Sequence, residues 1–87
     1  MQYSARMEPR RGAMLESLGR AVRARRAGAG LTLRALASRA GVSTRFLAQL
    51  EAGAGNISVA RLADLAEALG TTAGALLVAA EASPRPA

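Results

Sequence analysis

The sequence predicts an all-α fold, a bundle of five short helices. Apolar residues recur at three- and four-residue spacing through the middle of the chain, as in Leu15, Leu18 and Val22, and this is the period of one helix face. Serine, threonine and glycine residues separate the periodic segments at positions where helices begin and end. No window alternates apolar and polar residues or concentrates β-branched residues, so no strand is expected.

Turn and capping residues divide the chain into its helices. Thr32, Ser43 and Ser58 are expected caps, because their hydroxyls can accept a hydrogen bond from a first-turn backbone amide. Gly41 suits the left-handed residue that ends a helix, with Val42 following it as a hydrophobic plug. The predicted helices are 14–26, 33–40, 44–52, 59–69 and a short fifth after Thr72, with inward residues Leu15, Leu18, Val22, Leu33, Leu36, Ala37, Ala40, Phe46, Leu47, Leu50, Leu62, Leu65, Ala66 and Leu69.

The chain has room for a single domain. Its 87 residues can bury one helical core but not a second, and the domain is expected to span residues 14–80. Residues 1–13 contain Arg6, Arg10 and Arg11 and are interrupted by Pro9, so they are predicted to form a flexible basic arm. Residues 81–87 are predicted to form a flexible tail.

Composition favours a polyanionic partner. The net charge is +6, and every basic residue is an arginine, which suits nucleic acid or an anionic membrane surface. The absence of cysteine and histidine excludes a thiolate nucleophile, a disulfide framework and the usual zinc sites; neither a cofactor nor a metal is expected. No uncharged run approaches the ~20 apolar residues of a membrane span, so we expect a cytoplasmic bacterial protein associated with the nucleoid.

The break at Gly41 is the strongest local signal. Two short helices joined by a turn of three or four residues with a glycine form a helix-turn-helix, whose second helix enters the major groove of DNA. An ordinary helical corner carries the same local signals. The corner alone leaves both interpretations open.

Longer motifs resemble a known family. The phrases "LGRAVRARR", "LASRAGVSTRFLAQLEAG" and "ISVARLADLAEALGTTAGALL" are similar to the Xre or Cro/cI type of repressor, over residues 18–77. This resemblance implies a lambda repressor-like five-helix bundle that contains a helix-turn-helix. The phrase "RFLAQLEAGAGNIS" resembles regulators that respond to benzoyl-CoA, in which a shikimate-kinase-like domain follows; a small-molecule effector would then act only through a C-terminal domain that this chain lacks.

The predicted third helix carries the candidate base-reading residues. Its core-facing side leaves Thr44, Arg45, Ala48 and Gln49 pointing outward. Arg45 can bind O6 and N7 of guanine, and Gln49 can bind N6 and N7 of adenine, each worth about 1–3 kcal/mol of discrimination. The resemblance implies that Thr44, Arg45 and Gln49 face base edges and that Ser43 lies by the backbone or the first base. A phosphate contact for Arg45 and plain exposure for Gln49 are the alternatives.

Phosphate contacts are expected on both sides of this helix. The candidates are Thr32 and Arg34 at the start of the second helix, Asn56 and Ser58 before the fourth, and Arg23 among the arginines that precede the motif. Such contacts give affinity without sequence information. A solvated surface is the alternative for each arginine.

The loop after the third helix departs from the family pattern. Residues 52–56 lack the usual lysine or arginine, and Leu33 stands where many relatives have a glutamine that touches DNA. Gly53 and Gly55 would let backbone amides approach the sugar-phosphate chain. The alternative is that these glycines only end the helix and turn the chain.

A structural ion pair is expected between Arg26 and Glu51. Similar repressors pair the residues at these two positions, and the pair would tie the first helix to the end of the recognition helix. Removing either partner would leave an uncompensated charge.

The leading interpretation is a sequence-specific DNA-binding transcriptional regulator, a repressor that binds a palindromic operator as a homodimer. Leu76, Leu77 and Val78 exceed what a small core needs and are the expected dimer contacts. An antitoxin-like module that mainly binds a partner protein is the alternative. An enzyme is disfavoured because six carboxylates are scattered and no histidine or cysteine assists them; a membrane-surface role is disfavoured because the core needs the apolar stripe of the first helix.

Overall fold

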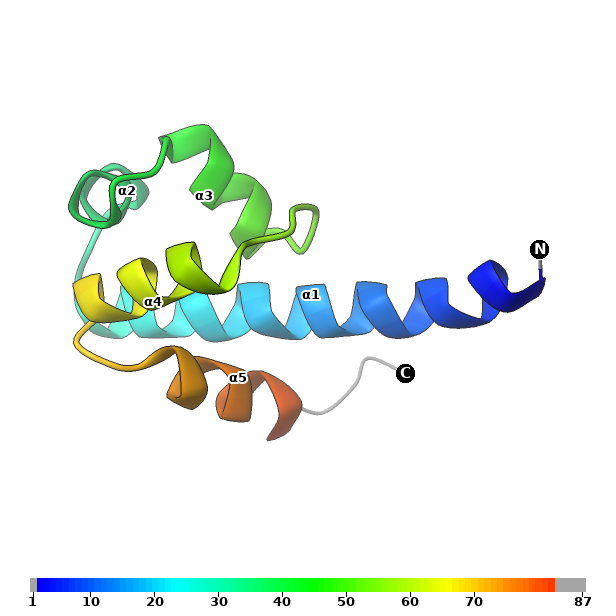
Figure 1. The fold of residues 1–87 in the computed structure, drawn as a ribbon. Helices are drawn as coiled ribbons and strands as arrows, with labels where there is room; N and C mark the ends of the chain where they lie inside the picture. The colour runs from blue at the N-terminus through cyan, green and yellow to red at the C-terminus, as the bar shows by residue number, and fades with distance from the viewer. Residues whose placement is uncertain (1, 83–87) are drawn as a thin grey trace.

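The computed structural model describes residues 2–82 of the chain, with side chains from residue 10 onward. Within residues 2–82 there are five helices and no strand, which confirms the predicted all-α class. The helices are α1 (Gln2–Gly28), α2 (Leu33–Ala40), α3 (Thr44–Glu51), α4 (Val59–Ala68) and α5 (Ala73–Ala82) (Figure 1).

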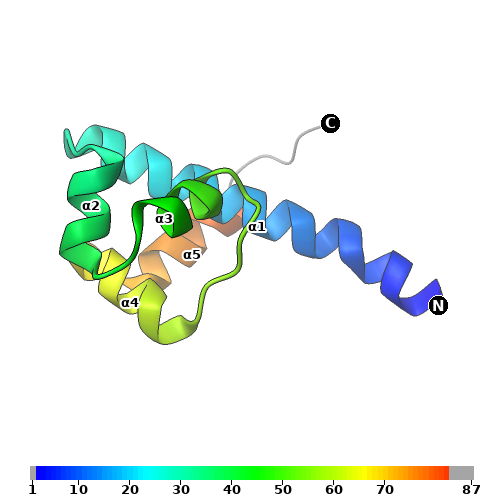
Figure 2. The same cartoon turned by 90° about the horizontal axis from the view of Figure 1, so that it is seen from above.

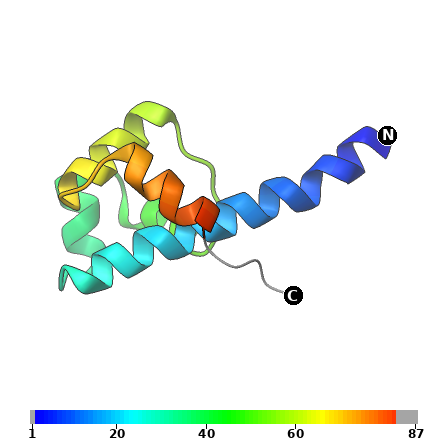
Figure 3. The same ribbon diagram turned by 90° about the horizontal axis from the view of Figure 1, so that it is seen from below.

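The long helix α1 organises the bundle. It packs against α3 and against α5. Helix α2 packs against both α3 and α4, and α4 packs against α5. Figure 1 shows α2 and α3 on one side of α1 and α5 on the other. The N-terminal part of α1 extends beyond the remaining helices in all three views (Figures 1, 2 and 3), and the Cα trace is accordingly elongated, at 41 × 23 × 21 Å.

One cluster of aliphatic side chains forms the core. Every helix contributes to it, and each leucine fully removed from water contributes about 1.5–3 kcal/mol. The inward positions predicted for α2 and α4 are confirmed, and so are Leu18, Val22, Leu47 and Leu50. The prediction that Leu15 faces the core is wrong, because it is only half-buried and lies outside the cluster. The buried residues are Leu18, Val22, Leu36, Ala37, Ala40, Leu47, Leu50, Leu62, Leu65, Ala66, Leu69, Leu76 and Ala80.

The first helix begins earlier than predicted. It starts at Gln2 and not near Met14, so residues 2–13, expected to be an irregular arm, form its first turns. Pro9 removes one backbone hydrogen bond, but alanine, methionine and arginine around it are good helix formers, and a helix already anchored by packing extends at little cost. At the other end, Glu81 and Ala82 complete α5, and residues 83–87 of the predicted tail lie outside the described residues.

Phe46 is not a core residue. The prediction that it is buried with Leu47 and Leu50 is wrong, because it is only half-buried and lies outside the core cluster. Leu47 and Leu50 point at the core, and Phe46 precedes Leu47 by one residue, or about 100° around the helix. Its ring therefore reaches the flank of α3.

Gly41 ends α2 as predicted. Its φ of 71° is left-handed, and the amide of Val42 donates to the carbonyl of Ala37 at 3.0 Å while that of Gly41 donates to Ser38 at 3.3 Å. These two bonds form the Schellman motif. Val42 packs against the core, so the chain leaves α2 in a defined direction.

A close approach of two backbones joins Gly19 of α1 to the end of α3. A Cβ atom at Gly19 would lie 2.7 Å from the carbonyl oxygen of Glu51 and nearer still to that of Leu50. Gly53, with a φ of 78°, comes against α1 in the same way, because its Cβ would lie 2.9 Å from the Cα of Glu16. The two backbones touch because both positions lack a side chain.

No single helix in residues 2–82 is long and apolar enough to cross a membrane. Helices α4 and α5 reach that composition only as a pair, and they are bent by 95° at their junction.

Substituting Gly19 tests this close approach. We expect Gly19→Ala to lower the free energy of unfolding by about 1–3 kcal/mol, because the methyl group forces the helices apart. Gly12→Ala is the matched control: a Cβ there has no neighbour within 4 Å, and alanine raises helix stability by up to about 1 kcal/mol. Urea unfolding followed by circular dichroism measures both. Equal stabilities of the two variants would contradict the packing described.

Candidate nucleic-acid interface

The turn between α2 and α3 presents one side of α3 to solvent. Leu47 and Leu50 are fully buried, and the opposite side carries Thr44, Arg45 and Gln49, all three exposed. Arg45 and Gln49 are four residues apart, so they lie one above the other on this side. The structure thus brings the predicted base-reading side chains of α3 together on a single exposed surface.

Hydroxyl caps open the three helices α2, α3 and α4, as predicted. Thr32 accepts from the amide of Ala35 at 3.0 Å, and Ser43 and Ser58 accept at 3.0 and 3.1 Å from the amides three residues after them. None of the three helices has an acidic residue in its first turn. The positive ends of their dipoles are therefore not neutralised, which favours an anionic ligand.

Charge around α2 and α3 is almost entirely positive. Between residues 17 and 63 the sequence contains one carboxylate, Glu51, and Arg26 pairs with it. The same stretch contains the exposed arginines Arg23, Arg34, Arg39, Arg45 and Arg61, whereas Arg20 and Arg25, also exposed, line hollows between α1 and α5. Glu16, just outside this stretch, is the exposed carboxylate beside the loop, where it lies against Gly53.

Arg23 and Arg34 occupy different flanks of this region. Arg34 is exposed in the first turn of α2, two residues after Thr32, which caps this helix. Arg23 is exposed on α1, four residues after Gly19 and three before Arg26, so it shares the side of α1 that faces α3. Both predicted phosphate-binding arginines therefore remain free to reach a ligand beside α3.

The fold requires glycine at only one of the two glycine positions in the loop after α3. Gly53 is required by its positive φ and by its contact with Glu16. Gly55 has no positive φ, and a Cβ there would meet the Cβ of Gln49 at 3.7 Å and the backbone between Gln49 and Leu50 at 3.8 Å, which are ordinary contact distances. The fold accepts a side chain at position 55, so its glycine leaves space beside Gln49 without being needed for the turn.

Asn56 stabilises the loop that leads to α4. Its Oδ1 accepts from the amide of Ile57 at 2.9 Å, and Ile57 packs against the core. The side-chain NH₂ group of Asn56 is then the donor left for a phosphate.

Arg26 ties three segments together. Its Nε donates to Oε2 of Glu51 at 2.6 Å, Nη2 donates to Oε1 at 3.0 Å, and Nη1 donates to the carbonyl of Leu31 at 2.9 Å. The side chains are only 16% and 7% exposed. The hydrogen bond with Glu51 raises the pKa of Arg26, although burial opposes this. Because folding raises the pKa of Arg26, its charged form stabilises the folded state at neutral pH. This contribution is lost only when the pH rises through the raised pKa.

The packing of α5 contradicts part of the predicted dimer interface. Leu76 is 1% exposed and Leu77 packs against the core, so the expectation that Leu76 is free for a partner is wrong. Leu76 fills the core because α5 packs on both α1 and α4. Val78 is 65% exposed, and it shares its side of the helix with the exposed residues Ala75, Ala79 and Ala82.

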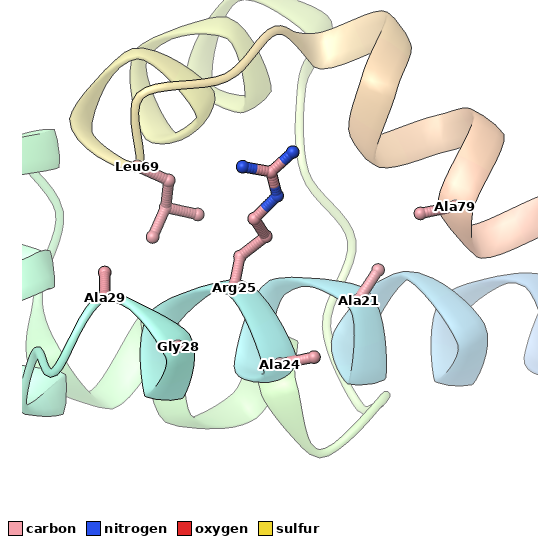
Figure 4. Close-up of a pocket in the computed structure, with 7 residues that line it drawn as sticks. All are labelled: Ala21, Ala24, Arg25, Gly28, Ala29, Leu69 and Ala79. Carbon is pink, nitrogen blue, oxygen red and sulfur yellow. The ribbon is translucent and has the colours of Figure 1, made fainter.

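A shallow hollow of about 540 Å³ lies between α1, α5 and the end of α4. Figure 4 shows the Arg25 side chain rising from α1 between Leu69 and Ala79. The other lining residues are small, namely Ala21, Ala24, Gly28 and Ala29. A lining with one guanidinium and no acid or nucleophile provides no catalytic constellation.

Comparison with known proteins identifies relatives of the chain. A model of the helix-turn-helix family matches residues 22–76. Two crystal structures of the clp gene regulator ClgR from Corynebacterium glutamicum are similar to this chain, both at 40% identity. One has a TM-score of 0.75 and covers 78% of this chain and 72% of its own; the other has a TM-score of 0.77 and covers 80% and 90%. A comparison with curated protein sequences finds no match.

Removing one partner of the Arg26 pair tests its structural role. We expect Arg26→Ala to lower the free energy of unfolding by about 3 kcal/mol, because it leaves the Glu51 carboxylate buried without a partner. Arg25→Ala removes the same charge from an exposed neighbour and is expected to change stability by less than about 0.5 kcal/mol. Chemical denaturation at neutral pH compares them. Equal effects of the two substitutions would rule out the structural assignment.

Proposed function

Since the chain belongs to the Xre-like helix-turn-helix family of DNA-binding transcriptional regulators, we propose that it represses transcription by binding a palindromic operator as a homodimer. In this proposal α3 lies in the major groove, and half-sites are about one helical turn apart. The observation that carries it is the exposed side of α3, where Arg45 and Gln49 lie one turn apart.

Base reading is assigned to four residues at the start and middle of α3. Arg45 offers a planar fork that matches guanine, and Gln49 offers an amide that matches adenine. Thr44 is exposed beside them. Ser43 uses its oxygen to accept from the amide of Phe46, which leaves its hydroxyl hydrogen to donate to the first base or to the backbone.

Phosphate binding is assigned to residues on both sides of α3. Thr32 and Arg34 would act from the start of α2, and Asn56 and Ser58 from the loop before α4, with Arg23 adding charge from α1. The proposal is supported by the uncompensated helix starts and by the absence of a free carboxylate between residues 17 and 63.

Dimerisation is assigned to the exposed side of α5. Ala75, Val78, Ala79 and Ala82 form an apolar row at helical spacing, and a two-fold interface places the same row on both partners. Leu77, the third dimer contact expected from the sequence, lies outside this row, because it is about 100° around the helix from Val78 and packs against the core. Leu76 is excluded from the interface by its burial.

Two finer assignments accompany this function. The phrase "RFLAQLEAGAGNIS" supports a relation to benzoyl-CoA-responsive regulators, in which case an effector would act on this domain through another one. As a regulator of bacterial operators, the protein would work on the nucleoid in the cytoplasm.

Partner binding is the second candidate function. The apolar row on α5 and the adjoining hollow would also suit a partner protein, as in antitoxin-like relatives. Weak DNA binding without sequence preference would favour this candidate.

Selection of bound sites from random duplex DNA tests the base-reading assignment. We expect the wild-type chain to enrich a symmetric motif, and Arg45→Ala and Gln49→Ala each to relax the preference at one position of every half-site, by about 1–3 kcal/mol. Arg23→Ala should weaken all sequences alike if it binds phosphate. An unsymmetric pool, or an unchanged motif with both α3 variants, would refute the assignment.

Gly55→Ala tests close backbone approach at the loop. The added methyl group meets no strain in the protein, so the thermal midpoint should stay within a few degrees of wild type. Affinity for specific and non-specific duplexes should fall together, because the methyl group separates the loop amides from the sugar-phosphate chain. Fluorescence anisotropy with labelled duplexes measures this. Unchanged affinity would mean that the loop glycine has no role in binding.

A further inference from the structure

The loop between α3 and α4 lacks the positive charge expected beside a recognition helix. Residues 52–58 contain no arginine, and the first one after α3 is Arg61, in the first turn of α4. The loop leaves the end of α3, runs outward and turns back to the start of α4 (Figure 2). Arg61 is therefore a candidate source of the missing charge.

Arg61 is held against α3 by an aromatic ring. Its guanidinium carbon lies 5.9 Å from the ring centroid of Phe46, the side chain that turned out to lie on the flank of α3. Phe46 is in the first turn of α3, next to Arg45 in sequence. A cation–π contact of this kind limits the positions that a long arginine side chain adopts, which lowers the entropy lost when it binds a ligand.

The backbone of Arg61 is also fixed. Its amide donates to Oγ of Ser58 at 3.1 Å, so the side chain leaves α4 from a capped first turn. The guanidinium is exposed, and among the described residues the only ion pair found joins Arg26 to Glu51. Arg61 thus presents a positioned positive charge that is not in an ion pair, although Asp64 lies three residues later on α4.

We propose that Arg61, held by the ring of Phe46, binds a DNA phosphate beside the groove that α3 enters and supplies the charge that the loop lacks. This inference rests on the proposed DNA-binding function. Phe46 is a positioning residue in this arrangement, because it acts through Arg61. The cation–π contact leaves the N–H groups at the edge of the guanidinium free for phosphate oxygens.

The test compares variants on a selected operator duplex and a scrambled duplex over a range of salt concentrations. Arg61→Ala should weaken binding to both duplexes by about tenfold and reduce the slope of log K against log salt by about 0.9. Arg25→Ala is the control, because it removes the same charge from the hollow between α1 and α5 (Figure 4). Its slope should match that of wild type.

Phe46→Leu separates positioning from charge. The substitution keeps the Arg61 charge, so the salt slope should stay at the wild-type value while affinity falls a few-fold. Combined with Arg61→Ala, it should add no further loss, since the ring acts through the guanidinium. Circular dichroism checks that each variant is folded, which is expected because Phe46 is only half-buried.

Failure of this inference differs from failure of the proposed function. If Arg61→Ala keeps the wild-type slope and affinity while Arg45→Ala still relaxes the sequence preference, the Arg61 assignment is wrong and the DNA-binding function stands. If Phe46→Leu weakens binding equally with and without Arg61, the positioning role is wrong. If the wild-type protein shows no preference for any duplex, the proposed function fails and this inference fails with it.

Discussion

The docking of the end of α3 on α1 is the contact on which the rest of this structure depends. The carbonyl groups of Leu50 and Glu51 lie directly against Gly19, and the Arg26 guanidinium holds the Glu51 carboxylate through two hydrogen bonds. A third bond from Arg26 reaches the carbonyl of Leu31, just before α2. Backbone contact and ion pair together fix one end of α3, and the turn after Gly41 with the Ser43 cap fixes the other.

This fixed orientation determines what the exposed side of α3 can do. Leu47 and Leu50 commit one side of the helix to the core, so Arg45 and Gln49 project from a helix that cannot rotate without breaking both end contacts. Arg26 has a second effect, because it pairs with the single carboxylate of the helix-turn-helix region. The same interaction that orients the helix also leaves its surroundings positively charged, as a phosphate chain requires.

Features that depend on neighbouring residues were predictable from the sequence. The caps at Thr32 and Ser43 and the left-handed Gly41 follow from local chemistry, and the buried leucines follow from the helical period. Of the features that depend on distant segments, the Arg26–Glu51 pair was predictable only through the family resemblance, and the close approach at Gly19 was not predictable. The need for glycine at position 19 comes from carbonyl groups some thirty residues later in the chain, and nothing in the sequence around it signals a close approach.

The other differences between the predicted and the observed structure also come from contacts between distant segments. Leu76 looked like surplus apolar surface, but α5 meets both α1 and α4, and this packing uses it. Phe46 fitted the apolar pattern of α3, but it lies on the flank of that helix, where its ring contacts Arg61. Sequence patterns therefore indicated the candidate site on α3, and the family resemblance indicated the Arg26–Glu51 pair that supports it. The close approach at Gly19 and the contact between Phe46 and Arg61 became apparent only from the packing of the helices.

The most direct test of the central claim is the ratio of affinities for a selected operator and for a scrambled duplex of the same composition, measured at one physiological salt concentration. The account predicts that the protein binds the operator at least about 10³-fold more tightly, and that replacing Arg45 and Gln49 together removes most of this ratio while leaving binding to the scrambled duplex nearly unchanged. Equal affinity of the wild-type protein for the two duplexes would contradict it.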